Sequence, residues 1–228
     1  MDRTSTRRSV RISLLASAAA VACLALSPSA TAATGDEHGM PNGLIKTQTH
    51  TQIREVTPIR AAAATESARI SSQLNYSQQV QQQDQWCWAA DGSSIEQSLG
   101  GSASQAQFCA AGKGGSGGYC VNQGAQIYEI VRGFQGTGFR AQDANGPISF
   151  DSIKSQIDGG MPSLTGIYWT QGGGHAEVIY GYDAGNQSIM IGDPWPSYER
   201  YQTWDYSEYS GYNGQFQWND TIVNIAKA

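Results

Sequence analysis

The first 69 residues lack aromatic side chains altogether. All 5 Phe, 6 Trp and 11 Tyr of the chain lie after residue 70. A polar segment with so little to bury does not form a core. We therefore expect residues 33–69 to be a linker or a short propeptide, and the sequence leaves both alternatives open. Residues 70–228 are then the folded domain, which is long enough for one real hydrophobic core.

Positive charge is also scarce. From Ser71 onward, 6 Lys and Arg stand against 14 Asp and Glu, which gives a net charge of −8. Nucleic acids and anionic membranes attract basic surfaces. We therefore expect neither as a partner, and we attribute the acidic balance to solubility outside the cell.

The one long apolar run, Ile12–Leu26, is short for a membrane span and rich in alanine. It follows four arginines in Met1–Arg11 and precedes the small residues of Ala30–Ala32. This order is typical of a secretory signal peptide. We expect residues 1–32 to be removed on export, by the general or the twin-arginine route. The mature protein should then be secreted, without stable membrane association.

Cysteine is scarce, and an odd number remains after export. Cys23 leaves with the signal peptide, so Cys87, Cys109 and Cys120 remain. In an exported protein this favours one disulfide and one free thiol. Cys109 and Cys120 flank a glycine-rich loop that a disulfide would close, so we predict that pair. The alternative is a zinc site of the three cysteines with His175, which no C-x-x-C spacing supports; we expect no metal and no cofactor.

The hydrophobic pattern changes its period along the domain. Helical spacing predicts one helix after Asp84 that ends at Gly100-Gly101, with Gly92 inside it for close packing. Two further helices are predicted, one capped by Asn122 with the apolar stripe Ile127, Ile130, Val131 and Phe134, and one over Phe150–Ile157. Five strands are predicted later, at Ser163–Trp169, His175–Tyr182, Ser188–Ile191, Tyr198–Trp204 and Thr221–Ile225. Helices followed by antiparallel strands indicate an α+β fold.

Cys87 lies between Trp86 and Trp88, where the first helix is expected to begin. The positive end of a helix dipole favours a thiolate there. The main-chain N–H of Cys87 and a glutamine side chain could together hold an oxyanion. Four upstream glutamines are candidates for that donor, namely Gln81, Gln82, Gln83 and Gln85. We expect the flanking tryptophans to bind substrate.

His175 is the one histidine from Ser71 onward, so it is the only imidazole base available to Cys87. It follows the loop Gln171–Gly174, and small neighbours such as Gly174 leave room for a substrate. A purely structural histidine is the alternative, but the lone free cysteine makes it less favourable. Asp193 ends the next predicted strand and is expected to orient His175. Asp183, a predicted turn residue, is the weaker candidate.

The motif Q-x-x-x-x-W-C-W-A-A resembles that of the papain-like cysteine peptidases, especially short bacterial secreted and effector members, and the chain is also similar to double-glycine leader peptidases. The resemblance implies an N-terminal helical half that bears the nucleophile and a C-terminal antiparallel sheet half. It also implies that Gln81 completes the oxyanion hole and that Cys87, His175 and Asp193 form a triad, followed by Trp195. The cysteine–histidine separation of 88 residues is shorter than the roughly 130–150 of papain. Asp also replaces papain's Asn, so specificity is left undetermined.

We therefore expect a secreted, monomeric cysteine endopeptidase that acts on protein or peptide substrates. One alternative uses the same triad for other acyl chemistry, as a cell-wall amidase or an acyltransferase. Another is an inactive binding module that uses the aromatic-rich stretch Tyr198–Trp218.

Overall fold

The structure is a computed structural model, and it describes residues 40–59, 70–115 and 117–228. Every described residue belongs to one compact unit, Asp36–Ala228. The predicted signal peptide, residues 1–32, lies outside the described residues. Within the described ranges, no helix has the length and apolar character needed to cross a membrane.

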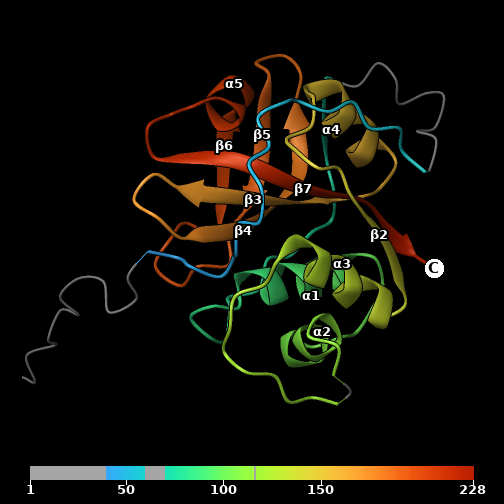
Figure 1. Ribbon diagram of the computed structural model, residues 1–228. Coiled ribbons are helices and arrows are strands. Elements are labelled where there is room, and N and C mark those ends of the chain that lie inside the picture. The colour runs from blue at the N-terminus through green and yellow to red at the C-terminus, as the bar shows by residue number, and fades with distance from the viewer. Residues whose placement is uncertain (1–39, 60–69, 116) are drawn as a thin grey trace, which may run out of the picture. The chain divides into compact units, whose positions relative to one another are not determined.

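Five helices and seven strands form within the described residues (Figure 1). The helices are α1 (Cys87–Ser98), α2 (Gln105–Gly112), α3 (Ile127–Gly136), α4 (Phe150–Asp158) and α5 (Tyr206–Ser210). The strands are β1 (Ser71–Gln73), β2 (Phe139–Asp143), β3 (Ser163–Trp169), β4 (Gly174–Asp183), β5 (Ser188–Gly192), β6 (Tyr201–Asp205) and β7 (Phe216–Lys227).

The strands pair antiparallel in the order β2-β7-β3-β4-β5-β6, and β1 pairs with the end of β4. Helices α1, α2 and α3 pack together on one side of this sheet (Figure 1). The predicted α+β fold is therefore confirmed, with the helix that bears Cys87 early in the chain and most of the sheet later.

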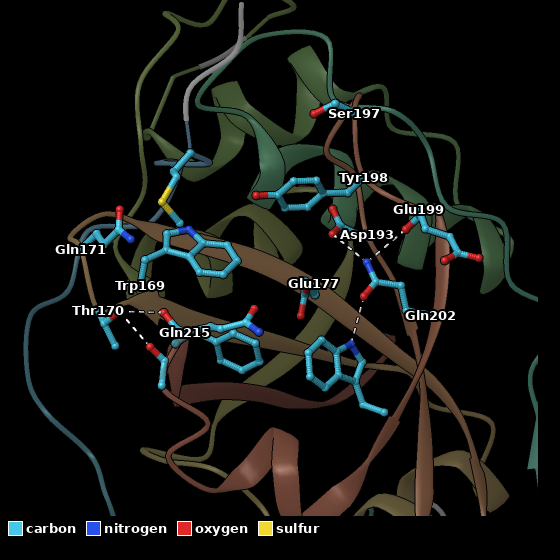
Figure 2. Close-up of a pocket in the computed structure, with 14 residues that line it drawn as sticks. Trp169, Thr170, Gln171, Glu177, Asp193, Ser197, Tyr198, Glu199, Gln202 and Gln215 are labelled. Carbon is cyan, nitrogen blue, oxygen red and sulfur yellow. Dashed lines mark hydrogen bonds between the residues drawn. The ribbon is translucent and has the colours of Figure 1, made fainter. Parts of the chain in front are cut away.

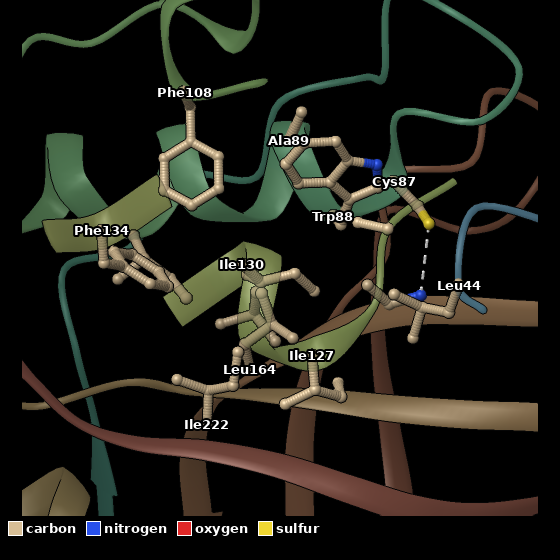
Figure 3. Packing of buried hydrophobic residues seen from close by; sticks show 14 of the residues in the cluster. Leu44, Cys87, Trp88, Ala89, Phe108, Ile127, Ile130, Phe134, Leu164 and Ile222 are labelled. Carbon is tan, nitrogen blue, oxygen red and sulfur yellow. Dashed lines mark hydrogen bonds between the residues drawn. The ribbon is translucent and has the colours of Figure 1, made fainter. Parts of the chain in front are cut away.

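The central strands β3 and β4 are buried on both faces, because alternate side chains of a strand point in opposite directions. Leu164 and Val178 belong to the cluster that includes the helices α1, α2 and α3, part of which Figure 3 shows. Ile167 and Ile179 belong to a second cluster, which includes side chains of α4 and α5. The sheet is thus a rigid central layer between two cores, and His175 lies on one of its best-buried strands.

Helix α1 begins at Cys87 itself. Its N-cap is Trp86, whose side chain makes no capping hydrogen bond, so the predicted N-cap position at Asp84 is wrong by two residues. Gly92 lies against α2, where a Cβ would approach the Phe108 ring to 2.2 Å. Only glycine allows the two helices to come this close, as predicted for this position.

Several elements were not predicted. Helix α2 begins with a capping box in which Ser104 and Gln107 satisfy each other's main-chain N–H groups. Helix α3 was predicted, but its N-cap is Gln126 rather than Asn122. The side chain of Asn122 instead accepts a hydrogen bond from the main-chain nitrogen of Gln85. Strands β1 and β2 and helix α5 are short and lack a strong apolar period, so the pattern did not indicate them.

Residues 40–59 contact the domain along their length. Leu44 is 3% exposed and belongs to the first core cluster. His50 Nδ1 lies 3.0 Å from Asp220 Oδ1, and Arg54 forms a bridge with Ile148. The segment was expected to have too little to bury to form a core, yet it contributes Leu44 to one; whether residues 33–69 are a linker or a propeptide stays open. Its lack of aromatic residues was misleading, because one leucine and many main-chain hydrogen bonds suffice to hold it.

Candidate active site

Cys87 is the first residue of α1 and is 1% exposed. The first N–H groups of a helix have no acceptor within the helix, so the thiol lies beside main-chain donors. The main-chain nitrogen of Ala176, on β4, donates to Cys87 Sγ at 3.4 Å (Figure 3). A disulfide joins Cys109 to Cys120 and leaves Cys87 free, which is the predicted pairing. The sulfur atoms of Cys109 and Cys120 are therefore not available as ligands for the alternative zinc site.

His175 and Asp193 meet through the β4–β5 hairpin. Val178 of β4 pairs with Gly192 of β5, so Asp193, the next residue, lies close to the start of β4. His175 Nε2 lies 2.9 Å from Asp193 Oδ1, and both side chains are fully buried. Asp183, the weaker candidate, instead accepts a hydrogen bond from Gly185 N in the hairpin turn.

The charge on His175 is controlled by its neighbours. Burial alone would lower the pKa of His175, but the Asp193 carboxylate and the nearby sulfur of Cys87 raise that pKa well above its ordinary value. Because Nε2 of His175 is hydrogen-bonded to Asp193, Nδ1 is the ring nitrogen that can exchange a proton with the Cys87 thiol. The arrangement can therefore hold an imidazolium beside the sulfur.

Three aromatic rings surround the imidazole of His175. The Trp169 ring stacks on it at a centroid distance of 6.2 Å and an interplanar angle of 19°. Trp195 and Tyr198 present their edges at 6.3 and 6.5 Å. These rings keep water away from the His175–Asp193 pair, and a low local dielectric strengthens it.

Gln81 is buried, as a donor near the thiol should be, but its amide is engaged elsewhere. Its Nε2 donates to the carbonyls of Gln83 and Asp84 at 2.8 and 2.9 Å. Its role in the oxyanion hole stays a prediction, and it requires that at least one of these bonds break. Gln85 is a poorer candidate, because its side-chain oxygen accepts from Gly124 N.

The two tryptophans beside Cys87 are buried. Trp88 is 0% exposed, packs against Phe108 and donates from Nε1 to the Gln123 carbonyl. Trp86 is 5% exposed and donates to the Val121 carbonyl. Trp88 therefore has no exposed surface for a substrate here and Trp86 has little, so their role in substrate binding stays a prediction. Residues at the start of a helix point in several directions, and the sequence does not show which of them face the core.

Residues 40–46, here called the strap, pass directly over Cys87. A Cβ on Gly43 would lie 2.2 Å from Cys87 Sγ and 2.9 Å from the Gln85 carbonyl oxygen. The strap is held on both sides, since Leu44 N donates to the Gly174 carbonyl at 3.0 Å and Ala125 N donates to the Gly43 carbonyl at 2.9 Å. The main chain around Gly174 thus binds an extended peptide segment, which here belongs to the same chain.

A cavity of about 580 Å³ lies beside the His175–Asp193 pair, and Asp193 and Glu177 are among the residues that line it (Figure 2). Asp193 Oδ2 accepts a hydrogen bond from Gln202 Nε2 at 3.3 Å. Among the described residues, donor atoms of His175, Glu177 and Asp193 converge within 4.8 Å, a spacing that would also suit a metal. Because Nε2 of His175 is already bonded to Asp193, we interpret this group as a hydrogen-bonded cluster.

Sequence reasoning missed Glu177 and Gln202 as members of this site. Glu177 lies two residues after His175 on one strand, so the alternation of a strand places both side chains on the same face. That signal was available. Gln202 lies on β6, two strands from His175, and only the sheet order brings it to Asp193.

Comparison with known proteins identifies relatives of this fold and sequence. Residues 68–209 match the family model described as papain-like cysteine protease AvrRpt2. Xylellain, a cysteine protease from Xylella fastidiosa, has a TM-score of 0.56 at 14% identity over 82% of this chain and 96% of its own. The peptidase domain of Streptococcus ComA has a TM-score of 0.53 at 20% identity over 68% of this chain and 100% of its own. No curated protein matches the chain.

Proposed function

Because the chain belongs to the papain-like cysteine proteases of the AvrRpt2 family, we propose that it is a secreted endopeptidase that uses Cys87, His175 and Asp193 as a triad. One observation carries the proposal. A fully buried His175–Asp193 pair, 2.9 Å apart, adjoins a free cysteine at the start of a helix. A nucleophile, its base and a group that orients the base are what acyl transfer through a thiol requires.

The reaction follows from these positions. The Cys87 thiolate attacks the peptide carbonyl, and the Cys87 N–H holds the oxyanion, with Gln81 as the second donor once its amide is released. His175 protonates the leaving amine, and the acyl-enzyme then reacts with water that His175 deprotonates. Asp193 keeps Nε2 occupied, so that Nδ1 faces the sulfur throughout.

The strap makes the full chain latent in this proposal, as a propeptide would. Gly43 lies against Sγ, so a substrate cannot reach the thiol while the strap is bound. The Gly43 carbonyl accepts from Ala125 N and the Pro41 carbonyl from Trp169 Nε1. Those two carbonyls therefore have donors other than the Cys87 N–H, which supports a blocking role for the strap rather than cleavage in this pose.

Export agrees with the Cys109–Cys120 disulfide, since disulfides persist in oxidising compartments. We expect the protein recovered from culture medium to have lost residues 1–32, with Ala33 or a later residue at its N-terminus. N-terminal mass spectrometry of the medium and of washed cells measures this. Recovery of the whole chain in the cell fraction alone would contradict secretion.

A thiol-directed epoxide inhibitor tests the triad. We expect one adduct on Cys87 near pH 6, measured by intact mass, in a chain that is cut after folding at a specific protease site inserted between residues 60 and 69 and is then separated from the segment that carries the strap. His175→Ala should lose the adduct, because no imidazolium then assists opening of the epoxide.

Absence of the adduct in the cut chain, with Cys87 still reduced, would contradict the proposal and favour a binding module. If the adduct forms, hydrolysis of casein and of purified cell wall is measured to distinguish the substrate classes. Release of products from cell wall only would show that the same triad is a cell-wall amidase.

A further inference from the structure

A second carboxyl group lies behind the His175–Asp193 pair. Glu177 is 5% exposed, and one oxygen each of Glu177 and Asp193 lies within 4.8 Å of the other and of a His175 ring nitrogen. Figure 2 shows both carboxyl groups in the cavity, with Gln202 bonded to Asp193. The proposed triad has no role for this buried acid.

Two hydroxyl groups fix the position of Glu177. Tyr209 of α5, which is fully buried, donates to Glu177 Oε2 at 2.7 Å. The Thr165 hydroxyl lies 2.7 Å from the Tyr209 hydroxyl and 3.2 Å from the Glu177 main-chain carbonyl. Strand pairing of Thr165 with Glu177 sets this geometry. The carboxyl group is therefore held in place and cannot turn away from Asp193.

The balance of charges in this cluster indicates that the carboxyl group of Glu177 is protonated. His175, on the same strand, contributes one positive charge when protonated, and Asp193, after β5, contributes one negative charge. A third charge on Glu177 would be buried and unbalanced, which is costly. Burial and the negative charge of Asp193 raise the pKa of Glu177, whereas His175 and the hydrogen bond from Tyr209 lower it. The net result is a pKa of about 7. These three residues are the titratable groups that act on it.

We propose that Glu177 is a positioning residue for peptide hydrolysis: as a neutral acid it donates a hydrogen bond to Asp193 and holds that carboxylate on Nε2 of His175. The inference rests on the proposed triad. Asp193 Oδ1 already accepts from His175 and from Trp195 N, and Oδ2 accepts from Gln202. A donor from Glu177 completes the set of contacts around Asp193. When Glu177 ionises, the donor is lost and two carboxylates repel each other.

The test compares pH profiles of Cys87 labelling by the epoxide in the full chain, in a Gly43→Ala background. In the parent, we expect the rate to fall above about pH 7 by up to about tenfold per pH unit, as Glu177 loses its proton. Glu177→Gln keeps a donor that cannot ionise, so this fall should disappear. Glu177→Ala removes the donor without leaving a charge, so it should lower the rate about tenfold below pH 7 and show no fall above it.

Glu96→Gln is the matched control. Glu96 is also buried with a pKa raised to about 7, by burial, but it lies nine residues after Cys87 on α1, about 13 Å along the helix. Its profile should equal that of the parent. An unchanged alkaline fall in Glu177→Gln would overturn the inference alone. Labelling that does not depend on His175 would instead overturn the proposed function, and this inference with it.

Discussion

Replacing Asp193 by alanine is expected to slow peptide hydrolysis by at least about 100-fold. His175 Nε2 would lose its partner at 2.9 Å in a fully buried site. The ring could then rotate, and Nδ1 would no longer be held toward Cys87. Casein hydrolysis by the cut chain measures the loss, under conditions where circular dichroism shows that the variant is folded.

The companion variant Asp193→Asn separates orientation from charge. The amide oxygen of Asn can still accept from His175 and from Trp195 N, so we expect its rate to stay within about tenfold of the parent. Asp183→Ala is the control, because Asp183 only closes the hairpin turn. If the Asp183 and Asp193 alanine variants had equal rates while both were folded, Asp193 would not belong to a triad.

Gly43→Ala is expected to activate the uncut chain. The new Cβ would lie 2.2 Å from Cys87 Sγ and 2.9 Å from a main-chain oxygen, so the strap must move. Overpacking of this kind typically costs about 1–3 kcal/mol. A shift of that size raises the population of the open state by about 5- to 150-fold. The rate of Cys87 labelling by the epoxide in the full chain should rise by a similar factor.

Gly118→Ala is the matched control, since a Cβ there has no described atom within 4 Å. It should leave the labelling rate unchanged. Equal rates for the Gly43 and Gly118 variants would show that the strap does not limit access to Cys87. Residues 33–69 would then be a linker, of which the described residues 40–59 pack on the domain.

The candidate triad could be predicted from the sequence because the relevant residue types are so rare. From Ser71 onward there is one histidine, and only three cysteines remain, two of which flank a loop suited to a disulfide. Strand β3 was predicted with its observed bounds, because a segment rich in β-branched and aromatic residues lies between Pro162 and a glycine loop. Scarcity and local pattern are properties of the sequence itself.

Other parts of the site depend on contacts between distant residues. Gly43 and Cys87 are 44 positions apart, and Leu44 meets Gly174 across 130. The strap is held by main-chain hydrogen bonds, which every residue type except proline can make, so its side chains do not reveal its place. Trp88 was predicted to contact substrate because it is next to Cys87 in the sequence. The packing of α1 against its neighbours instead places the Trp88 side chain in the core.

The sequence by itself therefore determined the family and the free thiol, and it predicted Cys87 as the nucleophile and His175 as its base, because each of these depends on residue types that occur only once or in one motif. The tertiary structure alone decided that the strap covers Cys87 and that Glu177 lies against Asp193. Both depend on the order and register of strands, and long-range packing sets that order.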